Sequence, residues 1–319
     1  RLGDFFEMFY KDAENISKEL DLALTSRAGV PMCGVPHHSA VSYIKRLIDN
    51  GRRVAICEKM EDPSLAKGLV KREVVRIITP GTVIEDGMLD ESRNNYILCL
   101  FYGEKCCGMV FADVSTGEIH LIQKSAKNVS ELSKGIIGEI GNYMPSEILF
   151  NDKFLDLDQV HFFITEKVSR CVADVLPDES FSPDNAETLT EQFVTESSGF
   201  IPDDMELCKK AVYALFGYIN ANYKSEVHRS VKFIVHGGSE YMELNFSARR
   251  NLELIETMRS REHRGSLLWV LDKTKTSLGK RRLKQVVSQP LMKQIKIMER
   301  LDAVEELSSD MSKLGGLRE

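Results

Sequence analysis

The chain begins with RLGDFFEMFYKDA (residues 1–13), a run in which aromatic side chains surround a single central glutamate. If residues 4–10 form a β-strand, successive side chains point to opposite faces of the sheet. One face then carries Phe6, Met8 and Tyr10 and is expected to be core. The other face carries Phe5, Glu7 and Phe9.

This second face places an aromatic ring, Phe5, beside a hydrogen-bonding carboxylate, Glu7. Composition alone favours an ordinary edge strand of a mixed sheet. The same pair of side chains is also able to enter a base stack and to probe the edge of a base. Both interpretations are compatible with this stretch taken by itself.

Further segments match known sequence motifs in one order along the chain. They are PMCGVPHH (31–38), VAICE (54–58), REVVRIITPGT (72–82), RRNLEL (249–254) and GSLLWVLDKTKT (265–276). Together with GDFFEMFYKDA (3–13), they resemble the MutS family of DNA mismatch repair proteins. The opening segment is similar to the Gly-Asp-Phe-Tyr-Glu signature of that family, with Phe6 where Tyr is common.

The resemblance implies that Phe5 and Glu7 contact a mispaired base in duplex DNA. A ring inserted beside a base gains roughly 1–3 kcal/mol of stacking. Since a mispair is easier to open than a Watson–Crick pair, Phe5 is expected to test how readily a base step opens. Glu7 is expected to accept a hydrogen bond from a base or, when protonated, to donate one.

Contacts to the DNA backbone are expected from basic side chains near this strand. Residues 43–76 contain nine basic and five acidic side chains. Lys67 and Arg76 are the predicted phosphate contacts. A solvated charged face is the alternative interpretation for most of the nine.

The fold class expected is a multidomain α/β plus α protein. Residues 1–88 are predicted to form a mixed sheet flanked by helices, which the resemblance makes a mismatch-binding domain. Residues 89–235 contain three apolar runs, then a helical stretch and another strand, which is the ribonuclease H-like order of a connector domain. Residues 236–319 are predicted to begin an all-α core or lever domain that is incomplete.

Composition and spacing also predict two smaller features of these regions. The stretch from Asp174 to Asn185 is rich in Pro, Asp and Ser and is predicted to be an exposed loop. Apolar residues recur at helical spacing near the end of the chain, and core packing is expected to bury them. This apolar stripe consists of Ile295, Met298, Leu301, Val304 and Leu307.

Composition indicates a globular protein, with 43% hydrophobic and 28% charged residues among 319. No apolar run is long enough for a membrane span, no export leader is recognisable, and a bacterial cytoplasmic, nucleoid-associated location is expected. The net charge of −6 is uneven, because residues 91–235 hold 22 acidic and 13 basic side chains. Seven scattered cysteines lack metal-site spacing, and most, Cys57 and Cys99 among them, are expected to be buried thiols.

No enzymatic motif is recognisable in these residues. The phosphate-binding pattern Gly-x-x-x-x-Gly-Lys-Ser/Thr is absent, since Gly279-Lys280 lacks the earlier glycine and is followed by Arg281. No metal or cofactor is expected in this chain. The chain is interpreted as a fragment, and the resemblance implies an ATP- and Mg²⁺-dependent ATPase in the full-length protein, which is expected to be a homodimer that receives a MutL-type partner through the connector.

Two other function classes stay open. Ribonuclease H-like sheets often hold carboxylates around two metal ions, and Asp113 and Glu118 at strand ends are the candidates for such a nuclease. The acidic middle region could instead serve as a protein-interaction platform alone.

Overall fold

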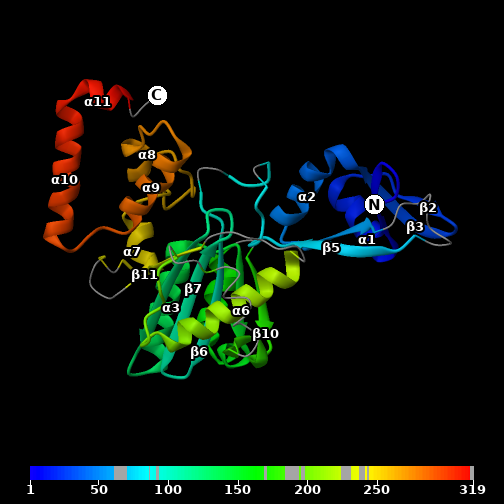
Figure 1. The fold of residues 1–319 in the computed structure, drawn as a ribbon, viewed down its shortest axis with the longest axis horizontal. Coiled ribbons are helices and arrows are strands. Elements are labelled where there is room, and N and C mark those ends of the chain that lie inside the picture. Colours follow the sequence, from blue (N-terminus) through cyan, green and yellow to red (C-terminus); the bar gives the residue numbers. More distant parts are fainter. Residues whose placement is uncertain are drawn as a thin grey trace.

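The computed structural model describes residues 1–60, 70–85, 87–90, 93–168, 171–183, 194, 198–223, 231–236, 241–242 and 244–316. Figure 1 shows a central sheet with the N-terminal part of the chain on one side and the last helices on the other. The prediction of an α/β protein followed by an α part is confirmed. Within the described ranges, no helix has the length and apolar character needed to cross a membrane.

The N-terminal part contains two separate antiparallel sheets. Strands β1 (Phe5–Phe9), β3 (Val30–Pro36) and β2 (Thr25–Arg27) form one sheet in the order β1-β3-β2, and β4 (Val54–Lys59) pairs with β5 (Arg72–Ile78) in the other. Helices α1 (Tyr10–Leu20) and α2 (Ala40–Asp49) accompany them. The mixed sheet expected here is wrong for the described strands, because the chain reverses direction between paired strands, through α1 and β2 for β1 and β3 and through a two-residue turn for β2 and β3.

The face alternation predicted for the first strand is confirmed for its central residues. Phe6 and Met8 pack against a buried cluster that includes Val35, Ile44 and Ile78. Tyr10 departs from the prediction, since it begins α1 with φ of +56° and its side chain is 66% exposed. The backbone turns out of the strand at this residue, so the alternation ends one residue earlier than expected.

The central sheet has six strands in the order β10-β9-β6-β7-β8-β11. Strands β6 (Tyr96–Gly103), β7 (Cys106–Asp113) and β8 (Glu118–Ser125) are antiparallel neighbours. Strand β9 (Glu147–Asn151) runs parallel to β6, β10 (Val172–Leu176) runs parallel to β9, and β11 (Lys232–Val235) runs parallel to β8. The predicted sequence of three antiparallel strands, a helix and a strand is confirmed.

Helices cover both faces of this central sheet. Helix α6 (Glu206–Tyr223) packs on one face, and α3 (Val129–Tyr143) and α4 (Asp158–Lys167) pack on the other (Figure 1). A side chain at Gly108 would place its Cβ 2.3 Å from the carbonyl carbon of Leu207. Glycine is therefore required there for the start of α6 to approach the sheet.

Within the predicted loop from Asp174 to Asn185, the described residues 174–183 do not form the exposed loop that composition predicts, and residues 184–185 lie outside the described residues. Asp174 lies within β10, and residues Asp178–Phe181 form the short 3-10 helix η3. Phe181 is 2% exposed, with its ring centroid 5.1 Å from that of Phe101. The apolar residues of this stretch supply a strand edge and a core contact, which outweighs the turn-forming composition around them.

The last part of the described chain is helical. It contains α7 (Phe246–Asn251), α8 (Leu267–Leu271), α9 (Ser277–Ser288), α10 (Gln294–Ser309) and α11 (Met311–Gly316). The apolar stripe lies on α10 as expected, but Ile295 is 75%, Leu301 55% and Val304 63% exposed. The expectation of core packing is wrong for this chain, because helical periodicity defines an apolar face without defining what covers it.

Candidate nucleic-acid interface

The register of the three-stranded sheet places Phe5 and Glu7 on one face. Phe5 lies opposite Pro36 and Glu7 lies opposite Gly34. Directly paired residues of neighbouring strands share a face of the sheet. We call the surface formed by Phe5, Glu7, Gly34 and Arg27 the probe face.

The ring and the carboxylate of the probe face differ in their exposure. Phe5 is 45% exposed, whereas the side chain of Glu7 is 14% exposed. A Cβ atom added at Gly34 would lie 3.5 Å from Cγ of Glu7 and 3.8 Å from Cδ1 of Phe5. The absent side chain therefore leaves the surface beside the pair open for another molecule to approach.

Arg27 reaches the probe face from β2, the strand at the opposite edge of the same sheet. Its Nη1 donates to Oε2 of Glu7 at 3.4 Å, and its side chain is 61% exposed. Sequence reasoning did not single out Arg27. A signal was present, because Arg27 directly precedes the turn-forming pair Ala28-Gly29. This turn leads into β3, the strand that pairs with the strand of Glu7, and so places the arginine next to β3.

The two predicted phosphate contacts have different outcomes. Lys67 lies outside the described residues. Arg76 lies on β5, where its guanidinium pairs with Glu85 and is centred 4.6 Å from the ring centroid of Tyr223. Its side chain is 21% exposed, so the structure gives it an internal packing role. A contact between Arg76 and DNA stays a prediction.

A second carboxylate, Glu147, lies where the N-terminal part of the chain meets the central sheet. Its Oε2 accepts from the Thr79 hydroxyl at 2.5 Å and from the Gly81 amide at 2.9 Å. Its Oε1 accepts from the Tyr218 hydroxyl at 2.5 Å and faces Arg53 Nη2 at 3.5 Å. We call these five residues the Glu147 joint.

Within the Glu147 joint the carboxylate is enclosed, whereas the Arg53 side chain is 37% exposed. The Glu147 side chain is 0% exposed, and Arg53 also pairs with Asp174 on β10. Burial, together with the neighbouring carboxylate, raises the pKa of Tyr218 to about 12. A Cβ at Gly81 would lie 2.8 Å from Oε2 of Glu147, so the Pro80-Gly81 turn needs its glycine for close approach.

Of the two carboxylates of the nuclease hypothesis, Asp113 is engaged in local structure. Asp113 is 1% exposed and accepts hydrogen bonds from Asn94 Nδ2 at 2.9 Å and from the Ser115 hydroxyl at 2.6 Å. These contacts fix the turn between β7 and β8. Among the described residues, no group of three or more His, Cys, Asp or Glu side chains is arranged to hold a metal ion.

Four of the seven cysteines are buried, and Cys57, Cys106 and Cys171 are partly exposed. Cys33, Cys99, Cys107 and Cys208 are buried, and burial raises the pKa of their thiols. Cys57 is partly exposed on β4, so the expectation of a buried thiol is wrong there. Other elements cover a two-stranded sheet only in part, so side chains on its strands stay partly exposed.

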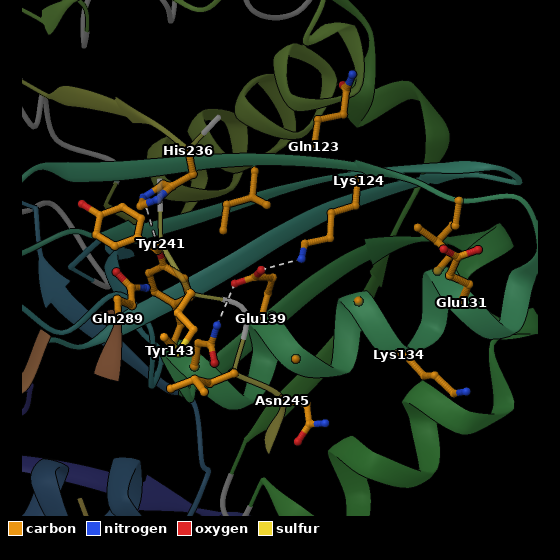
Figure 2. Close-up of a pocket in the computed structure, with 18 of the residues that line it drawn as sticks. Gln123, Lys124, Glu131, Lys134, Glu139, Tyr143, His236, Tyr241, Asn245 and Gln289 are labelled. Carbon is orange, nitrogen blue, oxygen red and sulfur yellow. Dashed lines mark hydrogen bonds and ion pairs between the residues drawn. The ribbon is translucent and has the colours of Figure 1, made fainter. Parts of the chain in front are cut away.

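A polar cavity of about 670 Å³ separates α3 and β8 from the segment around residues 241–249. Figure 2 shows Lys124 turned toward Glu139 and Tyr143 toward His236 within it. The Lys124 ammonium lies 2.7 Å from Glu139, and the Tyr143 hydroxyl lies 3.2 Å from His236. Because these side chains pair with one another across the cavity, its geometry does not define a ligand. Sequence reasoning did not anticipate it.

The fold and the probe face define a class of protein with two α/β parts and a helical part. The first α/β part presents an exposed ring beside a carboxylate. Models of MutS domain I, MutS domain II and MutS domain III match residues 1–87, 95–229 and 247–319, respectively. The chain belongs to the MutS family.

Curated relatives named DNA mismatch repair protein MutS agree with this assignment. The chain is 41% identical to that of Acetivibrio thermocellus over 314 residues, covering 96% of this chain and 35% of the relative. It is 41% identical to that of Ruminiclostridium cellulolyticum over 316 residues, covering 97% and 35%. The chain therefore spans about a third of the length of the relatives it matches.

Proposed function

We propose that this chain recognises mismatched or looped-out bases in duplex DNA and so initiates DNA mismatch repair. The observation that carries the proposal is the 45% exposure of Phe5 on the same sheet face as Glu7. This exposure places an apolar ring at the surface, beside the carboxylate and the open glycine position of Gly34. Membership of the MutS family supports the assignment.

Phe5 is proposed to act as a wedge in the minor groove. Inserting a ring between base pairs unstacks them at a cost of about a few kcal/mol per step. Stacking of the ring on a base returns about 1–3 kcal/mol. Because these energies nearly balance, a mispaired step that opens more easily decides whether the wedge enters.

Glu7 is proposed to hydrogen-bond the displaced base. As a carboxylate it accepts from a base N–H, and when protonated it donates to a ring nitrogen. Near phosphates its negative charge disfavours binding to intact duplex, where no base is free to accept or donate. Glu7 therefore contributes to discrimination rather than to overall affinity.

The remaining functional assignments are proposals that rest on family membership. We assign residues 1–88 to mismatch binding, 89–235 to a ribonuclease H-like connector and 236–319 to the start of the helical core. The strand order β8-β7-β6-β9-β10 supports the connector assignment. In the longer relatives' architecture, ATP and Mg²⁺ binding, homodimerisation and cytoplasmic, nucleoid-associated action would belong to the full-length protein, and a MutL-type protein would bind the connector.

Binding of matched duplexes tests the proposal directly. Affinities for a G·T-mismatched duplex and the fully paired duplex are measured at one salt concentration with the full-length protein, its Phe5→Ala variant and a Phe162→Ala control. Phe162 is 67% exposed on α4, away from the probe face. We expect Phe5→Ala to weaken mismatch binding by about 5- to 150-fold, the equivalent of the stacking energy, with little change on paired DNA. Equal loss on both duplexes would overturn the wedge assignment.

A further inference from the structure

The ion pair between Arg27 and Glu7 is weak enough to be exchanged. Its N–O distance of 3.4 Å exceeds the usual length of a charge-assisted hydrogen bond, and the arginine is 61% exposed. Solvent around the exposed guanidinium screens its attraction to Glu7 and can replace that contact. The guanidinium is therefore able to leave Glu7 for another anion without disturbing the sheet.

The backbone that carries Arg27 is nevertheless well fixed. Arg27 pairs with Val30 across a two-residue turn in which Ala28 and Gly29 have φ of +53° and +81°. The Thr25 hydroxyl also donates to the carbonyl of Met32 at 3.1 Å. Positive φ at both positions is typical of the tight hairpin turns that match strand twist. The Cα of Arg27 is held in place, while its exposed guanidinium retains freedom to turn.

We propose that Arg27 is a specificity-determining residue of the probe face, with two mutually exclusive anionic partners: the Glu7 carboxylate and a DNA phosphate. The inference rests on the mismatch recognition proposed above. On paired duplex Glu7 finds no base partner, so Arg27 stays paired with it and is withheld from the phosphates. On mismatched duplex Glu7 bonds the displaced base, and Arg27 is released to the backbone.

A mispair would thus add two contacts: one between Glu7 and the displaced base, and one between Arg27 and a backbone phosphate. Each phosphate neutralised by a cationic side chain releases counterions and steepens the salt dependence of binding. Because Arg27 reaches a phosphate only after Glu7 has left it, mismatched DNA gains one backbone contact that paired DNA lacks. The guanidinium suits both partners, since its planar donors match carboxylate and phosphate oxygens.

The slope of the logarithm of the binding constant against the logarithm of the salt concentration measures this exchange. For the full-length protein, the slope is determined on G·T-mismatched and on paired duplex. We expect the mismatched slope to be steeper, and we expect Arg27→Gln to reduce the difference between the two slopes by about 0.9, the contribution of one phosphate contact. Glu7→Gln should reduce the difference equally, because Arg27 then contacts phosphate on both duplexes.

Two controls separate this exchange from general charge effects. Arg27→Lys keeps the cation and should retain most of the slope difference. Arg52→Gln removes an arginine that is 56% exposed and paired with Glu19 at 3.1 Å, closely matching the Arg27 pair, and should leave the difference intact. An unchanged slope difference in Arg27→Gln, or an equal reduction in Arg52→Gln, would overturn the inference.

Failure of the proposed function gives a different result. A wild-type protein with equal affinity for both duplexes would overturn mismatch recognition and the Arg27 exchange together. A wild type that prefers the mismatch through Phe5, yet keeps its slope difference in Arg27→Gln, would overturn the Arg27 exchange alone.

Discussion

Glu7 and Glu147 are both glutamates on β-strands near an arginine, yet they have opposite surroundings. Glu7 is 14% exposed and faces one arginine at 3.4 Å. Glu147 is 0% exposed and accepts from two hydroxyls and a backbone amide beside its arginine. The first carboxylate retains hydrogen-bonding capacity for a partner outside the chain, whereas the second uses its capacity within the fold.

These surroundings determine which carboxylate is available for recognition. A buried charge is stable only when its surroundings pair and hydrogen-bond it, and such a group cannot be released cheaply. A carboxylate whose long ion pair is made with an exposed arginine has a partner that water or a ligand can replace. We therefore expect substitutions at the Glu147 joint to change folding, and substitutions on the probe face to change DNA binding.

The largest effect is expected for Glu147→Ala, which should lower the free energy of unfolding by about 3–5 kcal/mol. The change leaves the Thr79 hydroxyl, the Gly81 amide and Arg53 without their shared acceptor. Urea denaturation of the full chain measures it, with Glu166→Ala, at an exposed position of α4, as the control. Equal midpoints for the two variants would show that the joint does not stabilise the fold.

The next effect is expected for Gly81→Ala, at about 1–3 kcal/mol of destabilisation, because the new methyl group would lie 2.8 Å from both Glu147 Oε2 and Ile97 Cβ. Gly138→Ala is the matched control. No atom lies within 4 Å of its added Cβ, and it sits inside α3, so it should stabilise the chain by about 0.5–1 kcal/mol. Thermal unfolding that shifts both variants in the same direction would contradict this expectation.

A smaller effect is expected for Glu7→Gln, and it concerns DNA rather than folding. Removing the charge should tighten binding to paired duplex by about 1 kcal/mol and so narrow the gap between mismatched and paired DNA. Paired measurements of both affinities at constant salt provide the check. A gap of unchanged size would argue against an electrostatic role for Glu7 on intact duplex.

The smallest effect is expected for the folding stability of Arg27→Gln, at about 0–1 kcal/mol, because exposed ion pairs contribute little. The same substitution at Arg53, whose guanidinium faces Glu147 and Asp174, should cost more. Comparing the urea midpoints of the two variants sharpens the contrast between the regions. A larger loss of folding stability for Arg27→Gln than for Arg53→Gln would contradict the expected difference between the two regions.

Regular spacing of apolar residues in the sequence predicted the strands and faces that such spacing determines locally. Alternation placed Phe6 and Met8 in the core and Phe5 and Glu7 on the opposite face. Apolar runs separated by turns gave β6, β7 and β8. In each case the pattern repeats at the period of the element that it forms.

Contacts between distant segments were not predictable in the same way. The Glu147 joint connects residues that are up to 165 positions apart, such as Arg53 and Tyr218, and no spacing rule brings them together. The partner of Glu7 was missed for a similar reason, since Arg27 reaches it across an intervening strand. The apolar face of α10 was predicted, but its exposure depends on what else is present to cover it.

The Glu147 joint also bears on how this chain can be divided for engineering. Figure 1 shows β5 running from the N-terminal sheets toward the central sheet, and the joint lies just beyond its end. A segment cut after residue 88 would carry Thr79 and Gly81 away from their acceptor, and the remaining piece would keep a buried anion with fewer donors. A chimaera that exchanges the N-terminal part should therefore import residues 145–151 and Tyr218 from the same parent.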